Sequence, residues 1–262
     1  MLLLSDRGTD PLFWMEVNEK GEQKGALQAI PMLANPGENI TDPEALTYGN
    51  SYYYLLGSQS DPIDTRQHRL LRFDFDPVTR MIRSRIESIG NLRNIILSNI
   101  PEIAANGSRP GSVGGLNAEG LAWDPNHERL LIGLRSPLIG DQALLVPLRL
   151  RDQLGPFDQN NLQIDEPRLI ILPLDGQGVR DITYDPVLKK FLIISGPVVN
   201  GEEDDFNLWE WNGERDGPPR RLLTLDGKRR PEGIASLSIN DRNLLLITGD
   251  TGSFAALRYR QE

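Results

Sequence analysis

Four acidic residues stand at matching places in four repeated stretches of the sequence. Glu44, Glu119, Asp181 and Glu232 each open a short strand-like stretch, as in "EGLAWDP" and "DITYDP". A polar turn follows each stretch, and then an apolar run such as "RLLIGL" or "KFLIISG". Carboxylates that converge from several places can hold a cation, or one of them can keep its proton because like charges repel. The chemistry therefore depends on the fold that brings these acids together.

Each repeat predicts a β-hairpin followed by further strands. Asp-Pro is a favourable start for a type I turn, and the strand after it is apolar on both faces, as a strand between two packed sheets must be. Third-strand candidates follow each hairpin: "RLLRFDF", "ALLVPLRL", "FNLWEWN" and "FAALRYR". Fourth strands are expected in "PRLIILPL" and "RRLLTLD". Repeated units of four antiparallel strands are typical of a β-propeller, so the fold class is all-β.

The repeats predict one propeller domain over residues 1–262, with five recognisable units. The spacing between units exceeds the ~40–45 residues of a minimal blade, so insertions are expected. Apolar residues at near-helical spacing predict a short helical insertion around 89–104. The first unit, "LLLSD…LFWMEV…GALQAI", lacks an innermost strand, and the last unit lacks a fourth. Six blades are expected if the N-terminus is truncated.

Because the innermost strand of each blade lines the central channel, the four acids are expected to form one ring. A ring of oxygen ligands without His or Cys suits Ca²⁺ better than Zn²⁺. The alternative is structural, because Arg135, Arg180, Arg229 and Arg230 are available to pair with the carboxylates. The sequence leaves both interpretations open.

A third interpretation places an anion at the mouth of the channel. Arginines in excess of their acidic partners form a fork suited to a carboxylate or phosphate. The ends of the second strands would add polar groups to this mouth. The ligand-binding residues expected there are Asp6, Ser58, Arg135, Arg180 and Asp250, with Ser136 beside them.

Covalent catalysis has little support in this sequence, and the catalytic residues are unknown. The chain has no cysteine and two histidines, His68 and His127, and it contains no Gly-x-Ser-x-Gly elbow. An enzyme of this sequence would depend on metal-activated water or a carboxylate base. We would then expect a calcium-dependent hydrolase.

Composition bears on partners and location. The formal net charge of −9 argues against nucleic acid as a partner. No apolar run approaches the roughly 20 residues of a membrane span, and the N-terminus does not resemble a signal peptide, so a cytoplasmic location is expected for the chain as written. Unpaired edge strands in an incomplete blade predict self-association.

The motifs "LNAEGLAWDP…LLIGLRSPL…ALLVPL", "GVRDITYDP…FLIISGP…FNLWEWNG" and "PEGI…LLLITGD" resemble the bacterial family called domain of unknown function 3616. The resemblance covers most of the chain and implies a propeller of uncharacterised function. The "EGLA" opening is more distantly similar to gluconolactonase/regucalcin-type propellers and to esterase-like, phytase-related domains.

The sequence favours binding of a divalent cation or a small anionic ligand at the channel mouth. Two alternatives stay open. One is a metal-dependent hydrolase of an ester, lactone or phosphoester, and the other is a protein-interaction scaffold.

Overall fold

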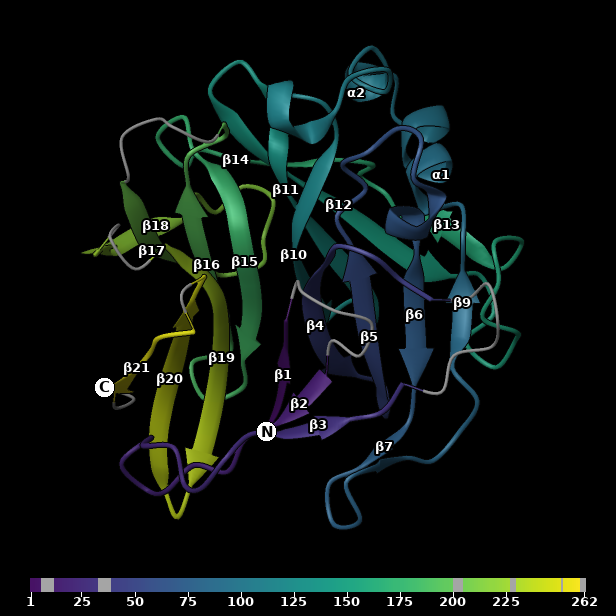
Figure 1. Cartoon of the computed structure of the whole chain (residues 1–262). Coiled ribbons are helices and arrows are strands. Elements are labelled where there is room, and N and C mark those ends of the chain that lie inside the picture. Colours follow the sequence, from purple (N-terminus) through teal and green to yellow (C-terminus); the bar gives the residue numbers. More distant parts are fainter. Residues whose placement is uncertain (6–11, 33–38, 200–204, 227–229, 251, 260–262) are drawn as a thin grey trace.

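The computed structural model describes residues 1–5, 12–32, 39–199, 205–226, 230–250 and 252–259. Within these residues the strands form five antiparallel blades around a common axis, which confirms the propeller (Figure 1). Asp6 and Arg229 lie outside the described residues.

Each blade is numbered in chain order from its first strand. Blade 1 contains β1 (Leu2–Leu4), β2 (Leu12–Trp14) and β3 (Gln28–Ile30). Blade 2 contains β4 (Pro43–Gly49), β5 (Tyr52–Gly57), β6 (Leu70–Phe73) and β9 (Glu87–Ile89), with a small side hairpin of β7 (Phe75–Asp76) and β8 (Met81–Ile82). Blade 3 contains β10 (Asn117–Asp124), β11 (Arg129–Ile139), β12 (Gln142–Leu150), β13 (Leu162–Ile164) and β14 (Ile170–Leu172). Blade 4 contains β15 (Gly178–Asp185), β16 (Lys190–Gly196), β17 (Phe206–Trp211) and β18 (Arg220–Leu225). Blade 5 contains β19 (Pro231–Ile239), β20 (Arg242–Gly249) and β21 (Phe254–Tyr259).

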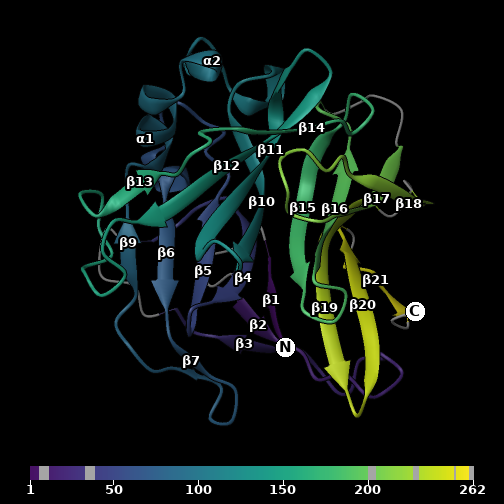
Figure 2. The ribbon, with the colours of Figure 1, turned by 180° about the vertical axis from the view of Figure 1, so that it is seen from behind.

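The innermost strands β4, β10, β15 and β19 stand side by side around the axis in both views (Figures 1 and 2). Each of them is the first strand of its blade and pairs with the second through a tight turn, as the repeat predicts. Blade 1 differs, because β1 pairs with β2 on one side and with no described strand on the other. The incomplete first and last units are thus confirmed for the part of the chain that the structure describes.

The expected helical insertion is present as α1 (Leu92–Asn99) and α2 (Pro101–Ala104). Two short outer strands were missed by the sequence pattern. β9 completes blade 2 from within the stretch expected to be strand-poor, and β13 pairs with one end of the long β12 while β14 pairs with the other. Three-residue strands carry too little periodicity to be found in a sequence.

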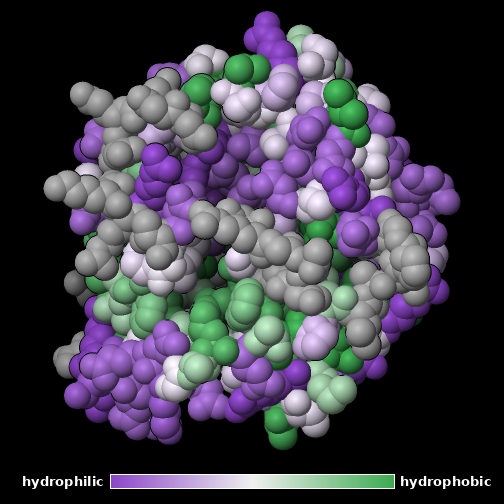
Figure 3. Space-filling view, viewed as in Figure 1, coloured by the Kyte–Doolittle hydropathy of each residue, from purple (hydrophilic) through white to green (hydrophobic). Residues whose placement is uncertain are grey.

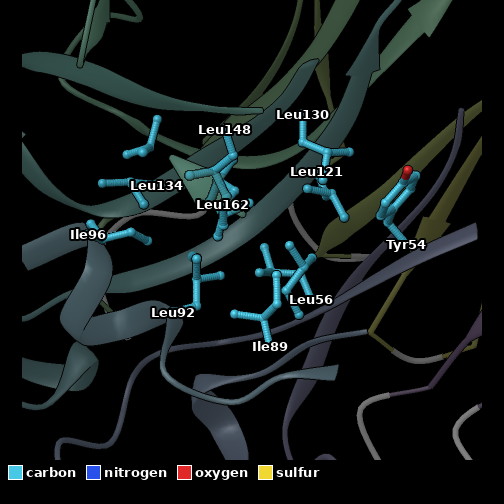
Figure 4. Packing of buried hydrophobic residues seen from close by; sticks show 14 of the residues in the cluster. Tyr54, Leu56, Ile89, Leu92, Ile96, Leu121, Leu130, Leu134, Leu148 and Leu162 are labelled. Carbon is cyan, nitrogen blue, oxygen red and sulfur yellow. The ribbon is translucent and has the colours of Figure 1, made fainter. Parts of the chain in front are cut away.

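A separate apolar cluster fills each interface between consecutive blades from 1 to 5. The largest lies between blades 2 and 3, where Leu56, Leu121 and Leu148 pack with Leu92 and Ile96 of α1 (Figure 4). Corresponding clusters join blades 1 and 2, 3 and 4, and 4 and 5. Trp209 and Trp211 both point into the interface of blades 3 and 4, in keeping with their alternation along one strand.

Blade 1 reaches blade 5 through the hairpin loop between β2 and β3. Gly21 sits there at φ +79°, and a Cβ on it would lie 2.4 Å from Cβ of Ala256. Glu19 accepts a hydrogen bond from Asn240 at 2.6 Å and pairs with Arg242 at 3.3 Å. The ring therefore closes through one small residue and exposed polar contacts, and no apolar cluster joins these two blades within the described residues.

Candidate functional site

Each innermost strand carries a β-bulge at a charged residue. The register of the first hairpin in blades 2 to 5 skips one residue at the start of the innermost strand, and the skipped residues are Glu44, Glu119, Arg180 and Glu232. A bulge re-aims the side chain that it leaves unpaired in the ladder. These four residues, one from each complete innermost strand, define the channel ring.

In blade 4 the residue left out of the ladder is not the acid of the repeat, although that acid also lines the channel cavity described below. Asp181 was expected to be the acid of blade 4, but the bulged residue there is Arg180 and Asp181 is the next residue. The ring is consequently three acids and one arginine. The pattern "RD" at 180–181 allowed either residue to be aligned with the acids, and only the register decides.

Arg180 joins two of the acids. Its Nη1 lies 2.9 Å from Oε2 of Glu119, and its Nη2 donates to Oε1 of Glu232. Arg135 donates from Nη1 to Oε1 of Glu119 at 3.0 Å, and Nδ2 of Asn117 donates to the same oxygen at 3.1 Å. Glu119 is therefore fully engaged in a buried arginine network, which is the structural interpretation of the acids.

Asp181 ties blade 4 to blade 5. Its two carboxylate oxygens accept hydrogen bonds from the backbone N–H groups of Ile182 and Ile234, both at 2.8 Å. Burial raises the pKa of Asp181 to about 8, against these hydrogen bonds, which favour the charged form.

Glu44 is in a different situation from the other acids. Its half-buried carboxyl forms no hydrogen bond or salt bridge in the described part of the chain. Burial raises its pKa well above the usual range, and the nearby charges of Glu119, Asp42 and Glu232 raise it further, while Arg180 lowers it. Of the ring acids, Glu44 is the one that forms no hydrogen bond or ion pair with a cationic side chain of the described residues.

A cavity of about 430 Å³ opens beside Glu44. It is lined by β1, by the start of β4 from Pro43 to Leu46, and by β19 from Glu232 to Ala235, and it includes Asp181. Apolar residues gather on this face of the molecule over β1 and the neighbouring parts of β19 and β20 (Figure 3). We call this space the channel cavity. It lies where an innermost strand of blade 1 would stand.

Of the residues expected at one polar mouth, Arg135 and Arg180 meet at Glu119. Ser58 is fully buried, and its carbonyl accepts from the N–H of Ala118 at 2.7 Å. Ser136 is also buried, with its hydroxyl donating to the carbonyl of Gly115 at 2.6 Å. Asp250 instead lines the channel cavity, where it pairs with Arg230 at 3.7 Å. The loop that follows α2 contacts this region through the carbonyl of Gly115. The position of this insertion on the propeller could not be predicted from the sequence.

The two histidines have ordinary surroundings. Nε2 of His68 lies 2.7 Å from the carbonyl of Asp61, and burial lowers the pKa of this imidazole. Nδ1 of His127 lies 2.8 Å from Oδ2 of Asp124 in the hairpin turn. Among the described residues no group of three or more His, Cys, Asp or Glu side chains is placed to hold a metal ion. In the same residues no helix has the length and apolar character of a membrane span.

The sequence profile of one family, described as protein of unknown function (DUF3616), matches residues 90–258. The chain belongs to the DUF3616 family. The match covers blades 3, 4 and 5 with the helical insertion, so it contains Glu119, Arg180 and Glu232, while Glu44 and β1 precede it. The chain has no match among curated proteins. The more distant similarity to lactonase-type and phytase-related propellers stays a prediction.

The sequence interpretation missed the cavity itself. It identified the absent innermost strand of the first unit, which is the signal from which the cavity could have been found. The position of the cavity beside Glu44 depends in addition on the order of the blades around the axis, which places β1 next to β4.

Proposed function

We propose that this chain is a binding protein whose channel cavity takes a small positively charged organic ligand, an ammonium or a guanidinium. The observation that carries the proposal is Glu44. It is the ring carboxyl that has no ion-pair partner in the part of the chain that the structure describes, and it lines the cavity. A ligand cation next to Glu44 would compensate the charge that burial and neighbouring acids now disfavour.

The balance of charge favours a cation over an anion. Arg180 is occupied by Glu119 and Glu232, and Arg135 by Glu119 and the carbonyl of Pro197 at 2.9 Å. Acids at the cavity outnumber the arginines near it, because Glu44, Asp181, Glu232 and Asp250 all line it. An anionic ligand would enter against this charge wherever Glu44 and Asp181 are ionised, and where they keep their protons it would still meet Glu232 and Asp250.

The walls of the cavity favour an organic cation over a bare metal ion. Leu46, Ile234 and Phe254 line it together with the leucines of β1. Ca²⁺ takes six to eight oxygen ligands, whereas apolar walls with a few placed polar groups are typical of sites for organic molecules. Calcium is the competing ligand that the test must include.

Isothermal titration calorimetry with L-argininamide, calcium chloride and sodium citrate, each at pH 6 and pH 8, tests the proposal. We expect saturable binding of argininamide that tightens at pH 8, because the cation competes with protons on raised-pKa carboxyls. Binding of calcium alone would favour a metal site, and binding of citrate alone would favour the anion. Either result would overturn the proposal.

Glu44→Gln is the variant that tests this site. Glutamine has nearly the shape of the protonated acid, so the variant should fold. We expect it to weaken argininamide by about tenfold or more, equivalent to 1.4 kcal/mol. Glu102→Gln, an exposed acid on α2, serves as the control and should leave the Kd unchanged. Equal affinity of wild type and Glu44→Gln would exclude Glu44 from the site.

A further inference from the structure

The channel cavity has the position and the boundaries of a β-strand. In blades 2 to 5 the innermost strand pairs with the second strand of its blade and stands beside the innermost strands of its neighbours. In blade 1 the cavity is bounded by β1 on one side and by β4 and β19, the innermost strands of the neighbouring blades, on the others. An extended segment placed there would complete blade 1 in the way the other blades are completed.

Within the described residues, the edge of β1 that faces away from β2 has no strand paired with it. Met1 and Met15 exchange two backbone hydrogen bonds, at 2.7 and 2.9 Å, so they form a hydrogen-bonded pair of the β1–β2 ladder. Such pairs alternate along antiparallel strands. The register Leu2–Trp14 and Leu4–Leu12 therefore directs the backbone N–H and C=O groups of Leu2 and Leu4 to the other edge. No described strand pairs with them.

The carboxylates beside the cavity indicate which side chain such a segment should carry. Each innermost strand contributes one bulged residue to the channel ring, and the fifth contribution, from blade 1, would lie between Glu44 of blade 2 and Glu232 of blade 5. Arg180 plays the equivalent part in blade 4, where it pairs with the acids of the blades on both sides. A basic residue is thus the side chain that fits the fifth position.

We propose that an extended segment of another polypeptide adds to β1 as the fifth innermost strand and places an arginine or lysine between Glu44 and Glu232. This is β-strand addition, in which main-chain hydrogen bonds supply affinity and side-chain pockets supply specificity. Apolar residues flanking the basic one would face Leu46 and Ile234, as Val179 and Ile182 flank Arg180 in the buried core between blades 3 and 4. The inference rests on the proposed function, because it identifies the cation as a side chain.

The molecule itself provides the probe. The sequence "GVRDITY" of β15 has the strand pattern and the arginine, and with blocked ends it carries no net charge, so it has no general attraction to an acidic protein. Fluorescence anisotropy of the labelled peptide should show saturable binding. A peptide with citrulline in place of the arginine keeps the shape without the charge and should bind about tenfold or more weakly.

Two further comparisons test the strand geometry and the site. Methylating alternate backbone nitrogens of the peptide should abolish binding when the methylated set faces β1 and preserve it when the other set is methylated. In Glu44→Gln the arginine peptide and the citrulline peptide should bind with nearly equal affinity. The reason is that the change in the protein and the change in the peptide remove the same ion pair.

The outcomes separate this inference from the proposed function. Binding of argininamide without binding of the peptide would leave the proposed function standing and overturn strand addition. Loss of both would overturn both. A concentration-dependent dimer that is abolished by Glu44→Gln would show that a second copy of the chain fills the cavity, which would contradict the proposed foreign partner.

Discussion

The interface between blades 4 and 5 and the interface between blades 5 and 1 share blade 5 but are built differently. In the first, Ile194 and Leu208 pack against Ile234 and Ile247, and Asp181 bonds across to the backbone of Ile234. In the second, the described contacts are those of Gly21 and Glu19, and the channel cavity lies between the blades. The same blade thus forms a packed joint on one side and an open joint on the other.

The difference shows how a repeated fold acquires a site. Four blades use equivalent innermost strands, and the bulges of these strands bring four charged residues to one level of the channel. In blade 1 the described residues include no innermost strand, and among them the same geometry leaves a space beside an edge of β1 with no paired strand and a carboxyl with no ion-pair partner. Stability comes from the complete joints, and binding is expected at the incomplete one.

The largest difference in stability between the two joints is expected from Arg180→Ala. It leaves Glu119 buried with one arginine fewer and Glu232 without its bond to Arg180, and breaking a buried ion pair from one side costs about 3–5 kcal/mol. The matched change at the open joint is Arg242→Ala, which removes a half-exposed pair with Glu19 and should cost about 1 kcal/mol or less. Urea unfolding of both variants measures the difference, and equal costs would show that the two joints are not distinct.

Enlarging a side chain at the two kinds of joint should change the free energy of unfolding by smaller amounts, which differ between the joints. Ala122 is fully buried between blades 3 and 4, so Ala122→Leu overpacks the core and should cost about 1–3 kcal/mol. Ala235 lines the channel cavity, so Ala235→Leu has room and should change the free energy of unfolding by less than about 1 kcal/mol. The second variant should also weaken argininamide, because its side chain enters the site.

If Ala235→Leu destabilised the chain as much as Ala122→Leu, the cavity would be closed in solution. Thermal melts of the two variants with calorimetry on Ala235→Leu are sufficient to decide this.

The fold followed from the sequence because the repeat combines a turn signal with strand periodicity in each unit. The "DP" turns at 124–125 and 185–186 and the apolar second strands after them predict hairpins that the structure confirms. Glu44, Asp181 and Glu232 could likewise be predicted to approach one another, and all three line one cavity. The bulge at Arg180 could not be predicted, since it depends on which residue leaves the ladder. The cover over Ser58 and Ser136 could not be predicted either, because it comes from packing of the insertion.

Stability should also depend on pH. The pKa of Asp181 is about 8 in the folded chain and has its ordinary value of 3.8 when the chain is unfolded. Between these values the folded state binds the extra proton, so stability should fall as pH rises, and Asp181 alone contributes a slope of at most about 1.4 kcal/mol per pH unit. Urea unfolding at pH 5, 6, 7 and 8 measures the slope. Asp181→Asn should reduce the slope by this amount, and a slope unchanged in this variant would assign the titration to another group, such as Glu44.

Hydrogen exchange followed by mass spectrometry, with and without the "GVRDITY" peptide, tests most directly whether the joint between blades 5 and 1 is the binding site. In the free chain we expect fast exchange in β1 and slow exchange in β10 and β15, which packed blades cover on both sides. Saturating peptide should slow exchange in β1 and at the starts of β4 and β19, and leave the other joints unchanged. Protection confined to the free edge of β21, or no change in β1, would contradict the account.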